Sequence, residues 1–168
     1  MKKVKYNHFL EEATNALSGN GAFLTVKSED KVNTMTIGWA NIGYVWGKPI
    51  MMVAVRKSRY TYQLIKNSSN FTVSIPFGDK MKDELMFCGT KSGREYDKFS
   101  ECNLTKLPAN NVDSPLIKGC DLHYECQISY KQFMNSENLV QSIKNNYYKE
   151  DDYHMLYFAE ILNCYREE

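Results

Sequence analysis

The stretch NTMTIGWANIGYVWGKP, residues 33–49, combines strand-forming residues with three glycines. Its threonine, isoleucine, valine and tryptophan residues favour a β-strand, whereas Gly38, Gly43 and Gly47 weaken one. Glycine inside a strand often marks a bulge, or a place where a ligand comes close to the backbone. We therefore expect a strand that lies against a ligand, with Gly38 and Gly43 permitting the bends of a closed barrel.

The composition is that of a globular protein with balanced charge. The chain has 168 residues, of which 43% are hydrophobic, so residues 1–168 are expected to form a single domain that buries a core without disulfides. Lysine and arginine total 21 against 20 aspartate and glutamate residues. This balance argues against nucleic acid or an acidic membrane as a partner, and any anion site must be local.

Cysteine usage indicates a reducing compartment. The five cysteines are odd in number and form no CxxC pair, which is typical of free thiols in a cytoplasmic protein: Cys88, Cys102, Cys120, Cys126 and Cys164. The N-terminal residues MKKVKYNHFLEEATNAL contain no continuous apolar run, so no signal peptide is predicted. The longest apolar run, residues 50–55, is too short to cross a membrane.

Hydrophobic periodicity predicts a mainly β protein with α additions. Strands are expected at residues 22–28, 33–46, 50–55, 70–76, 121–133 and 153–165, and helices at 9–17, 59–67, 79–88 and 136–146. Ser58 and Ser136 are expected to cap two of the helices, while Gly19 and Gly89 are expected to end two. Residues 89–119 show no regular pattern. Many strands joined by short turns favour a mainly antiparallel barrel.

The segment VRKSRYTYQLI, residues 55–65, has the chemistry of an anion site. An apolar strand ends in Arg56 and is followed by Ser58, Arg59 and Thr61 at the expected start of a helix. Guanidinium groups, hydroxyls and free backbone amides can all donate to a phosphate. A capped helix with surface arginines would show the same pattern, but two of the four arginines of the chain lie here.

A second segment, CGTKSGREYDKF at residues 88–99, is a loop that can offer Lys91 or Arg94 to a ligand. It lacks the spacing of a Walker loop, because Thr90 stands where that motif needs the glycine before its lysine. No GxGxxG follows a predicted strand, so a Rossmann dinucleotide site is not expected. A solvated connection remains an equal alternative for this loop.

Histidine and cysteine do not suggest a metal site. Cys120, His123 and Cys126 are spaced on an expected strand so that the histidine faces away from the two thiols, and no metal is predicted. His154 stands at the start of the last strand, where it could contact a cofactor or substrate or simply make a structural hydrogen bond.

Taken in order, these segments resemble a known family. The run NTMTIGW (33–39), the GKP turn, VRKSRYTYQLIKNSSNFTVSIP (55–76), CGTKSGREYDKF (88–99) and YFAEI (157–161) resemble the flavin reductase-like proteins of the FMN-binding split-barrel superfamily, especially the flavoredoxin type. The resemblance extends from about residue 20 to 165. It implies a six-stranded Greek-key antiparallel barrel, a homodimer and one FMN per subunit near the dimer interface.

The resemblance also implies which residues bind FMN. Thr34, Met35, Thr36 and Trp39 would follow the flavin ring, Ala54, Val55 and Arg56 would flank the ribityl chain, Ser58, Arg59, Tyr60 and Thr61 would hold the phosphate, and Lys91 and Ser92 would approach from above. His154 falls where some reductases place a histidine near the nicotinamide. The polar segment 134–152 has no counterpart in the family pattern.

Three functions remain open at this point. The first is a flavin reductase in which FMN accepts hydride from NADH or NADPH and passes electrons to a second acceptor. The second is a flavoredoxin-type electron carrier that is reduced by a protein partner. The third is a related barrel that binds another cofactor, such as pyridoxal phosphate or heme.

Overall fold

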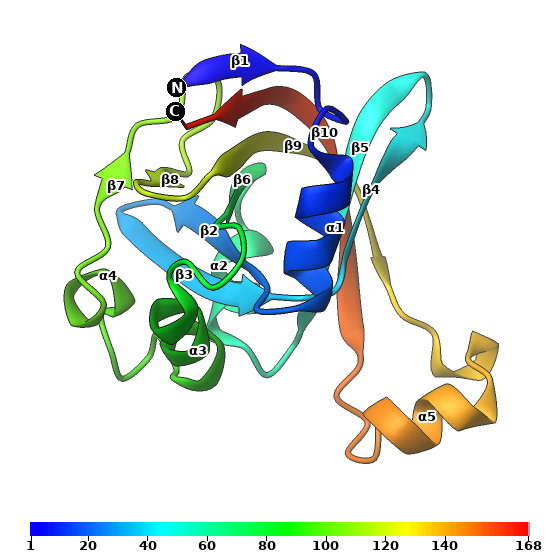
Figure 1. Ribbon diagram of the computed structural model, residues 1–168. Helices are drawn as coiled ribbons and strands as arrows, with labels where there is room; N and C mark the ends of the chain where they lie inside the picture. Colours follow the sequence, from blue (N-terminus) through cyan, green and yellow to red (C-terminus); the bar gives the residue numbers. More distant parts are fainter. Residues whose placement is uncertain (168) are drawn as a thin grey trace.

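The computed structural model describes residues 1–167 as a mainly β protein with short helices (Figure 1). The strands are β1 (Lys2–Val4), β2 (Ala22–Ser28), β3 (Lys31–Ile37), β4 (Ala40–Val45), β5 (Lys48–Arg56), β6 (Asn70–Ile75), β7 (Lys106–Leu107), β8 (Leu116–Ile117), β9 (Leu122–Phe133) and β10 (His154–Arg166). The helices are α1 (Leu10–Ser18), α2 (Tyr60–Ile65), α3 (Lys82–Thr90), α4 (Lys98–Glu101), α5 (Gln141–Tyr147) and the 3-10 turn η1 (Ser136–Asn138). No helix among these is long and apolar enough to span a membrane.

The main sheet is antiparallel throughout and follows the order β3-β2-β6-β9-β10-β5-β4, with β1 added beside β10. Its two edge strands, β3 and β4, are consecutive in the chain and are separated only by Gly38 and Trp39. When β3 and β4 are counted as one bent strand and the short β1 is left aside, the eight strands reduce to six. The bend therefore joins the two edges of the sheet, so that the strands close around the core.

The connectivity is the predicted Greek key. Strands β2, β3 with β4, and β5 follow one another as neighbours, and β6 then returns to pair with β2 on its other side. This arrangement confirms the six-stranded antiparallel barrel expected from the sequence.

The three glycines of the opening stretch have different roles. A Cβ atom at Gly38 would lie 3.0 Å from the carbonyl oxygen of Leu17, so the bend passes close to the end of α1. Gly47 has a φ of 71° beside Trp46 at 54°, which is the two-residue turn that joins β4 to β5. Gly43 has no atom within 4 Å of an added Cβ and is not required by packing.

Two hydrophobic clusters hold the barrel together. The main cluster fills its interior, where Leu24, Met51 and Val73 are completely buried, and α1 contributes Ala13 and Leu17. The smaller cluster lies outside β2 and beneath α3 and α4; its members are Phe23, Leu85, Cys88, Phe99, Leu104, Ile117 and Cys120. Because both faces of β2 and β6 are covered, these strands are buried almost throughout.

The connection after α4 also packs against the sheet. Thr72 of β6 donates a hydrogen bond to the carbonyl of Pro115, and Glu125 of β9 accepts hydrogen bonds from the backbone N–H of Asn110 and the side chain of Asn111. These bonds, together with Leu104 and Ile117 of the smaller cluster, hold the irregular residues after position 101 on the sheet. The structure places α4, β7 and β8 within residues 89–119, which were predicted to lack regular structure.

The long strands and α1 lie near their predicted positions, but the predicted strand 33–46 is divided into β3 and β4, β1 was not predicted, and three helix ends were wrong. Arg59, not Ser58, is the N-cap of α2, and it makes no side-chain capping bond. Gly89 lies within α3 instead of ending it, because α3 packs closely on β3: a Cβ there would be 3.3 Å from Cβ of Thr36. Asn135, not Ser136, caps the 136–146 region, which breaks into η1 and α5.

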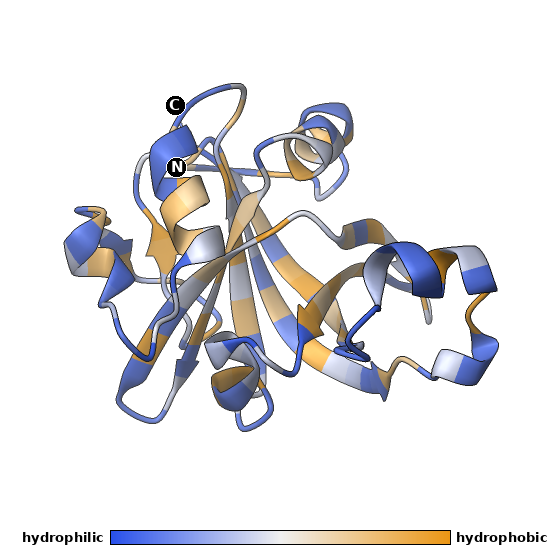
Figure 2. Ribbon diagram, turned by 90° about the horizontal axis from the view of Figure 1, so that it is seen from below, coloured by the Kyte–Doolittle hydropathy of each residue, from blue (hydrophilic) through white to orange (hydrophobic). Residues whose placement is uncertain are grey.

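Residues 134–153 form a projecting arm that contains η1 and α5. Figures 1 and 2 both show this arm standing out from the barrel between β9 and β10. Its helix α5 has no buried residue, and Val140 and Ile143 are exposed. The arm is nevertheless fixed where it meets the barrel, as described below.

Candidate functional site

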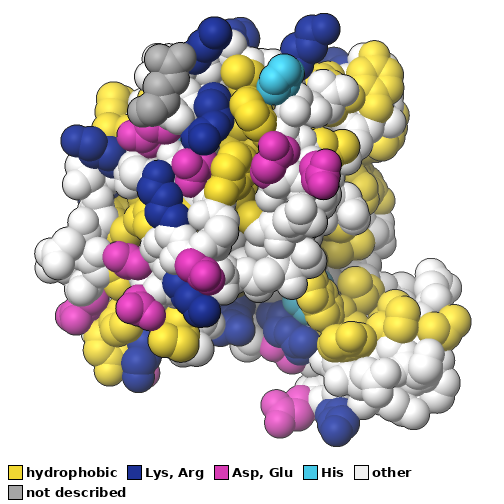
Figure 3. All heavy atoms as spheres, viewed as in Figure 1, with side chains coloured by type: hydrophobic (Ala, Val, Ile, Leu, Met, Phe, Trp, Pro, Cys, Tyr) yellow, Lys and Arg dark blue, Asp and Glu magenta, His cyan; other side chains and the backbone are white. Residues whose placement is uncertain are grey.

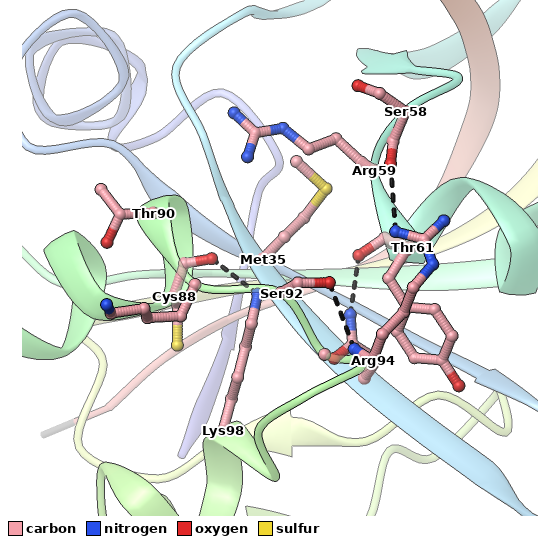
Figure 4. A pocket seen from close by; sticks show the side chains of 13 residues that line it. Met35, Ser58, Arg59, Thr61, Cys88, Thr90, Ser92, Arg94 and Lys98 are labelled. Carbon is pink, nitrogen blue, oxygen red and sulfur yellow. Dashed lines mark hydrogen bonds between the residues drawn. The ribbon is translucent and has the colours of Figure 1, made fainter.

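A strongly basic pocket lies between β3, the start of α2 and the connection from α3 to α4 (Figure 4). Its volume is about 150 Å³, and its lining residues are Asn33, Met35, Ser58, Arg59, Tyr60, Thr61, Cys88, Thr90, Lys91, Ser92, Gly93, Arg94 and Lys98. We call it the cationic pocket, because four of these side chains are basic and none is acidic. Such a surface attracts a ligand that carries at least one negative charge.

Lys98 shows most clearly that the pocket suits an anion. Its side chain is only 3% exposed, and its Nζ donates to the carbonyl of Cys88 at 2.7 Å. Burial lowers the pKa of Lys98, and the charge of Arg59 lowers that pKa further. Within residues 1–167, no carboxylate forms an ion pair with Lys98, Arg59, Lys91 or Arg94. A buried ammonium without a carboxylate is unfavourable unless a ligand supplies the missing charge.

The other side of the cationic pocket is held by hydrogen bonds. Asn33 donates to the hydroxyl of Thr61 at 2.8 Å, which links β3 to α2. Gly93 passes so close to this link that a Cβ there would lie 2.1 Å from Oδ1 of Asn33. Because α2 has only six residues, side chains and not a helix dipole must provide most of the positive charge.

A second pocket adjoins the first. It has a volume of about 170 Å³ and is lined by Met35, Thr36, Ile37, Gly38, Trp39, Ala54, Arg56, Arg59 and His154. We call it the aromatic pocket. The two pockets share Met35 and Arg59, so together they form one continuous site. Four basic side chains line one end, and Trp39, His154 and Arg56 line the other. Figure 3 shows Lys or Arg side chains and a histidine in the recess between the barrel and the arm.

Arg56 fastens the arm to this site. Its guanidinium donates to the carbonyl of Asp152 at 3.0 Å and to that of Tyr147 at 2.9 Å. The carboxylate of Asp152 in turn accepts hydrogen bonds from the hydroxyl of Ser58 at 2.5 Å and from its backbone N–H at 3.3 Å. Two members of the anion cradle predicted from sequence, Arg56 and Ser58, therefore bind the arm in this structure.

His154 is held in an aromatic environment. Its side chain is 6% exposed, its ring lies 4.7 Å from the ring of Trp39, and its Nδ1 is 2.8 Å from the hydroxyl of Tyr148. Burial lowers the pKa of His154 to about 4, and the nearby Arg56 acts in the same direction. The imidazole is consequently neutral at pH 7.

The two pockets bring together most of the residues that the sequence singled out. Eleven line one or both pockets: Met35, Thr36, Trp39, Ala54, Arg56, Ser58, Arg59, Tyr60, Thr61, Lys91 and Ser92; His154 lines the aromatic pocket as well. Thr34 and Val55 line neither. Thr34 is fully buried and bonds the hydroxyl of Thr25, while Val55 lies in the main hydrophobic cluster.

The predicted strand geometry of Cys120, His123 and Cys126 is only partly correct. Cys120 precedes β9 and packs in the smaller cluster, whereas Cys126 lies in the main cluster. His123 contacts Ser74 and Glu167 through its two ring nitrogens. The three side chains have separate structural surroundings.

Sequence reasoning missed Asn33, Gly93 and Lys98 as members of the site. A signal for Lys98 was present: Asp97 is the N-cap of α4, and its carboxylate accepts from the backbone N–H of Phe99. That cap turns the chain so that Lys98 points back into the cationic pocket. The burial of Lys98 still depends on the carbonyl of Cys88 at the end of α3, which the sequence did not predict to lie beneath this side chain.

Comparisons with known proteins agree with this architecture. Residues 15–168 match the family described as "Flavin reductase like domain". An uncharacterized protein of Archaeoglobus fulgidus is 33% identical over 106 residues, which cover 63% of this chain and 59% of that protein. The chain thus spans less than two thirds of this relative.

Solved structures show the same fold. Flavoredoxin of Desulfovibrio vulgaris has a TM-score of 0.69 and 24% identity, with 88% of this chain and 69% of that chain covered. The NADH:FAD oxidoreductase of Streptomyces globisporus, solved with NAD and FAD fragments, has a TM-score of 0.64 and 18% identity, with 87% of this chain and 73% of that chain covered. These likenesses confirm the predicted split-barrel fold.

The close approach at Gly93 gives a test of the site's construction. Gly93→Ala should destabilise the protein by about 1–3 kcal/mol, because the new methyl group collides with Asn33 and the ring of Tyr60. Gly43→Ala is the matched control, since its methyl group meets no atom within 4 Å. Urea unfolding of both variants measures the difference. Equal midpoints for the two variants would show that Gly93 is not under steric constraint.

Proposed function

The chain belongs to the flavin reductase-like domain family, and from this premise we propose that it is an FMN-binding oxidoreductase. The observation that carries the proposal is the pairing of a cationic pocket, which contains no carboxylate, with an adjoining aromatic pocket. A flavin mononucleotide has two ends that match these pockets, a phosphate and a flat aromatic ring with polar and apolar edges. Pyridoxal phosphate is shorter than FMN and would leave one of the two pockets unfilled.

The residues of the cationic pocket fit the phosphate. Arg59 and Lys91 would neutralise its charge, and the hydroxyls of Thr61 and Ser92 would donate hydrogen bonds to it. Lys98 adds a positive charge from beneath, held in place by the carbonyl of Cys88. Four basic side chains exceed the charge of one phosphate, and this excess favours retention of the ligand over exchange.

The residues of the aromatic pocket fit the ring. Trp39 and Ala54 would provide apolar contact. The hydroxyl of Thr36 donates to the carbonyl of Leu85, and this bond fixes the part of the pocket wall that Thr36 forms. When bound, the flavin supplies the hydride and electron chemistry, and the protein supplies position, water exclusion and access. No side chain of the chain is required as a general base.

We propose NADH or NADPH as the electron donor and treat an electron-carrier role as the second candidate. The nicotinamide assignment is supported by the likeness to an oxidoreductase solved with NAD fragments, and the carrier role by the likeness to flavoredoxin. In the carrier role, a ferredoxin-like protein would replace the nicotinamide. Both candidates use the same flavin site.

We also propose a homodimer. An aromatic patch surrounds the turn between β4 and β5, where Tyr44, Trp46 and Tyr130 are exposed and the ring of Trp46 lies 6.1 Å from that of Tyr130. Burying such a patch against a second copy of the chain would remove it from water. The family resemblance independently implies a homodimer.

Arg59 provides the direct test of the phosphate assignment. Arg59→Ala should weaken FMN binding by about 1.5–3 kcal/mol, a rise in Kd of about 10- to 150-fold, because a charge-assisted contact is lost. Lys118→Ala is the control, since Lys118 is exposed and lies outside both pockets. Fluorescence titration with FMN measures both. Unchanged affinity in Arg59→Ala would place the phosphate elsewhere.

Anaerobic mixing separates the two candidate functions. The FMN-loaded protein should lose its absorbance near the oxidised-flavin bands within seconds when NADH or NADPH is added. Slow bleaching by both nucleotides, together with fast reduction by a reduced ferredoxin, would instead identify an electron carrier. A protein that never acquires a flavin spectrum with added FMN would refute both.

The dimer is tested by mass in solution. The double variant Trp46→Ser with Tyr130→Ser should sediment as a monomer, whereas the unaltered protein should sediment as a dimer. Met86→Ser serves as the control, because Met86 is 62% exposed but lies on α3, away from the aromatic patch. A monomeric unaltered protein would contradict the proposal.

A further inference from the structure

Two cysteines meet beside the cationic pocket. Cys88 lies near the end of α3, is 1% exposed and lines the pocket, whereas Cys102 directly follows α4 and is half-buried. Both are free thiols that contact each other, and both side chains pack in the smaller hydrophobic cluster. Thiols that already touch need little movement to reach the bonding distance of a disulfide.

Lys98 holds the two cysteines in place through bonds that do not involve sulfur. Its ammonium donates to the carbonyl of Cys88 at 2.7 Å, as Figure 4 shows. Its own carbonyl accepts from the backbone N–H of Cys102 at 3.2 Å. The contact between the thiols therefore follows from the way in which α4 is attached to α3, and it does not depend on the weak attraction of one thiol for the other.

The chain between the two cysteines forms one wall of the cationic pocket. Residues 89–101 connect them, and the pocket-lining residues in this segment are Thr90, Lys91, Ser92, Gly93, Arg94 and Lys98. Three of the four basic side chains of the pocket thus lie between Cys88 and Cys102. A covalent bond between the two sulfurs would hold the ends of this wall together.

The surroundings of the thiols determine how fast they can be oxidised. Burial raises the pKa of Cys88 to about 12 and also raises the pKa of Cys102. Glu84 acts in the same direction on both, and Glu101 on Cys102, whereas the charge of Lys98 favours both thiolates. Because the thiolate is the form that attacks an oxidant, the pair is oxidised slowly at neutral pH. Cys102 is the thiol that solvent reaches.

We propose that Cys88 and Cys102 are a site of oxidative modification, at which hydrogen peroxide joins the two thiols in a disulfide that holds one wall of the cationic pocket closed. The Cys102 thiolate attacks one peroxide oxygen, and the O–O bond breaks to give a sulfenic acid and hydroxide, which takes up the proton that Cys102 released. The sulfur of Cys88 then attacks the sulfenic sulfur. The S–O bond breaks, and the hydroxyl leaves as water with the proton of Cys88. Two thiols and one peroxide thereby become one disulfide and two waters.

The same burial makes the disulfide long-lived once it has formed. A thiol with a raised pKa is a poor leaving group in thiol–disulfide exchange, so a small reductant cleaves such a bond slowly. The pair is therefore suited to a slow and lasting modification, and not to the rapid turnover of a catalytic dithiol. Formation of the disulfide does not require a flavin, whereas its effect on a ligand rests on the proposed function.

Peptide mass spectrometry tests the cross-link in the full chain without added ligand. Peroxide followed by alkylation should yield a disulfide between Cys88 and Cys102, with the other three cysteines alkylated. Cys126 and Cys164 are the internal control, because they also lie near each other but are buried in the main cluster. The initial rate should rise about tenfold from pH 7 to pH 8, because the pKa of Cys102 lies above both.

Two results of this experiment would overturn the modification site. One is a pair of thiols that both remain free after prolonged exposure to peroxide. The other is conversion of Cys102 to sulfinic acid without a cross-link to Cys88, since a sulfenic acid beside an available thiol forms a disulfide first.

Thermal unfolding tests whether the bond constrains the chain. The oxidised protein should unfold at a temperature about 6–12 °C higher than the reduced protein, as expected for a cross-link that closes a loop of about 15 residues. Cys102→Ser is the matched control, because it retains the size of this half-buried side chain but cannot form the bond. An unchanged midpoint in the cross-linked protein would show that the bond does not hold the wall in place.

Release of FMN tests the effect on the pocket. The oxidised protein should release FMN roughly 3- to 10-fold more slowly than the reduced protein, because the wall that carries Lys91 and Arg94 can no longer move away. Peroxide should not change the release rate of Cys102→Ser. Equal rates for the oxidised and reduced protein would overturn the effect on the pocket. Failure of both forms to bind FMN would instead refute the proposed function and leave the cross-link and unfolding results intact.

Discussion

The bend at Gly38 and Trp39 is the constraint on which the rest of the structure depends. It carries one strand from the first edge of the sheet to the last and so closes the barrel. The same bend supplies both pockets: Asn33, before it, lines the cationic pocket, and Trp39, within it, lines the aromatic pocket. Because Gly38 lies against the end of α1, the bend cannot move without disturbing the core.

The second organising feature is the cationic pocket, whose lining has basic side chains and no carboxylate to balance them. Arg59, Lys91, Arg94 and Lys98 converge on one pocket, and folding must bring these charges together and bury one of them. The ligand-free protein bears that cost in stability, whereas an anionic ligand removes it. Affinity for the ligand and stability of the folded protein are thereby linked, since a ligand that binds only the folded state stabilises it.

The sequence predicted the barrel because its strands are long and apolar, and a strand such as β2 can be recognised from its own residues. The sequence predicted which segments form the site, but not which side chains of each segment face the pockets. Along β5, Ala54 and Arg56 line the aromatic pocket while Val55, between them, packs in the core. Side chains alternate along a strand, so which face meets the ligand depends on strands elsewhere in the chain.

The same limit applies to Lys98 and to the arm. Lys98 is buried against Cys88 of α3, a contact between residues 10 apart that depends on how the loop between them folds, whereas Tyr148 is buried against Arg56, more than 90 residues earlier in the chain. A tyrosine in a polar segment carries no sign of such a distant partner. Ser58 shows another effect of a distant partner. The sequence predicted that it caps α2, but in the folded protein its hydroxyl donates to the carboxylate of Asp152.

The way in which Arg56 holds the arm has a consequence for evolution and for engineering. Both of its hydrogen bonds to the arm are to main-chain carbonyls, at Tyr147 and Asp152, and these groups are present whatever the side chains are. The exposed part of the arm, residues 136–146, can therefore change in sequence while its attachment to the barrel persists.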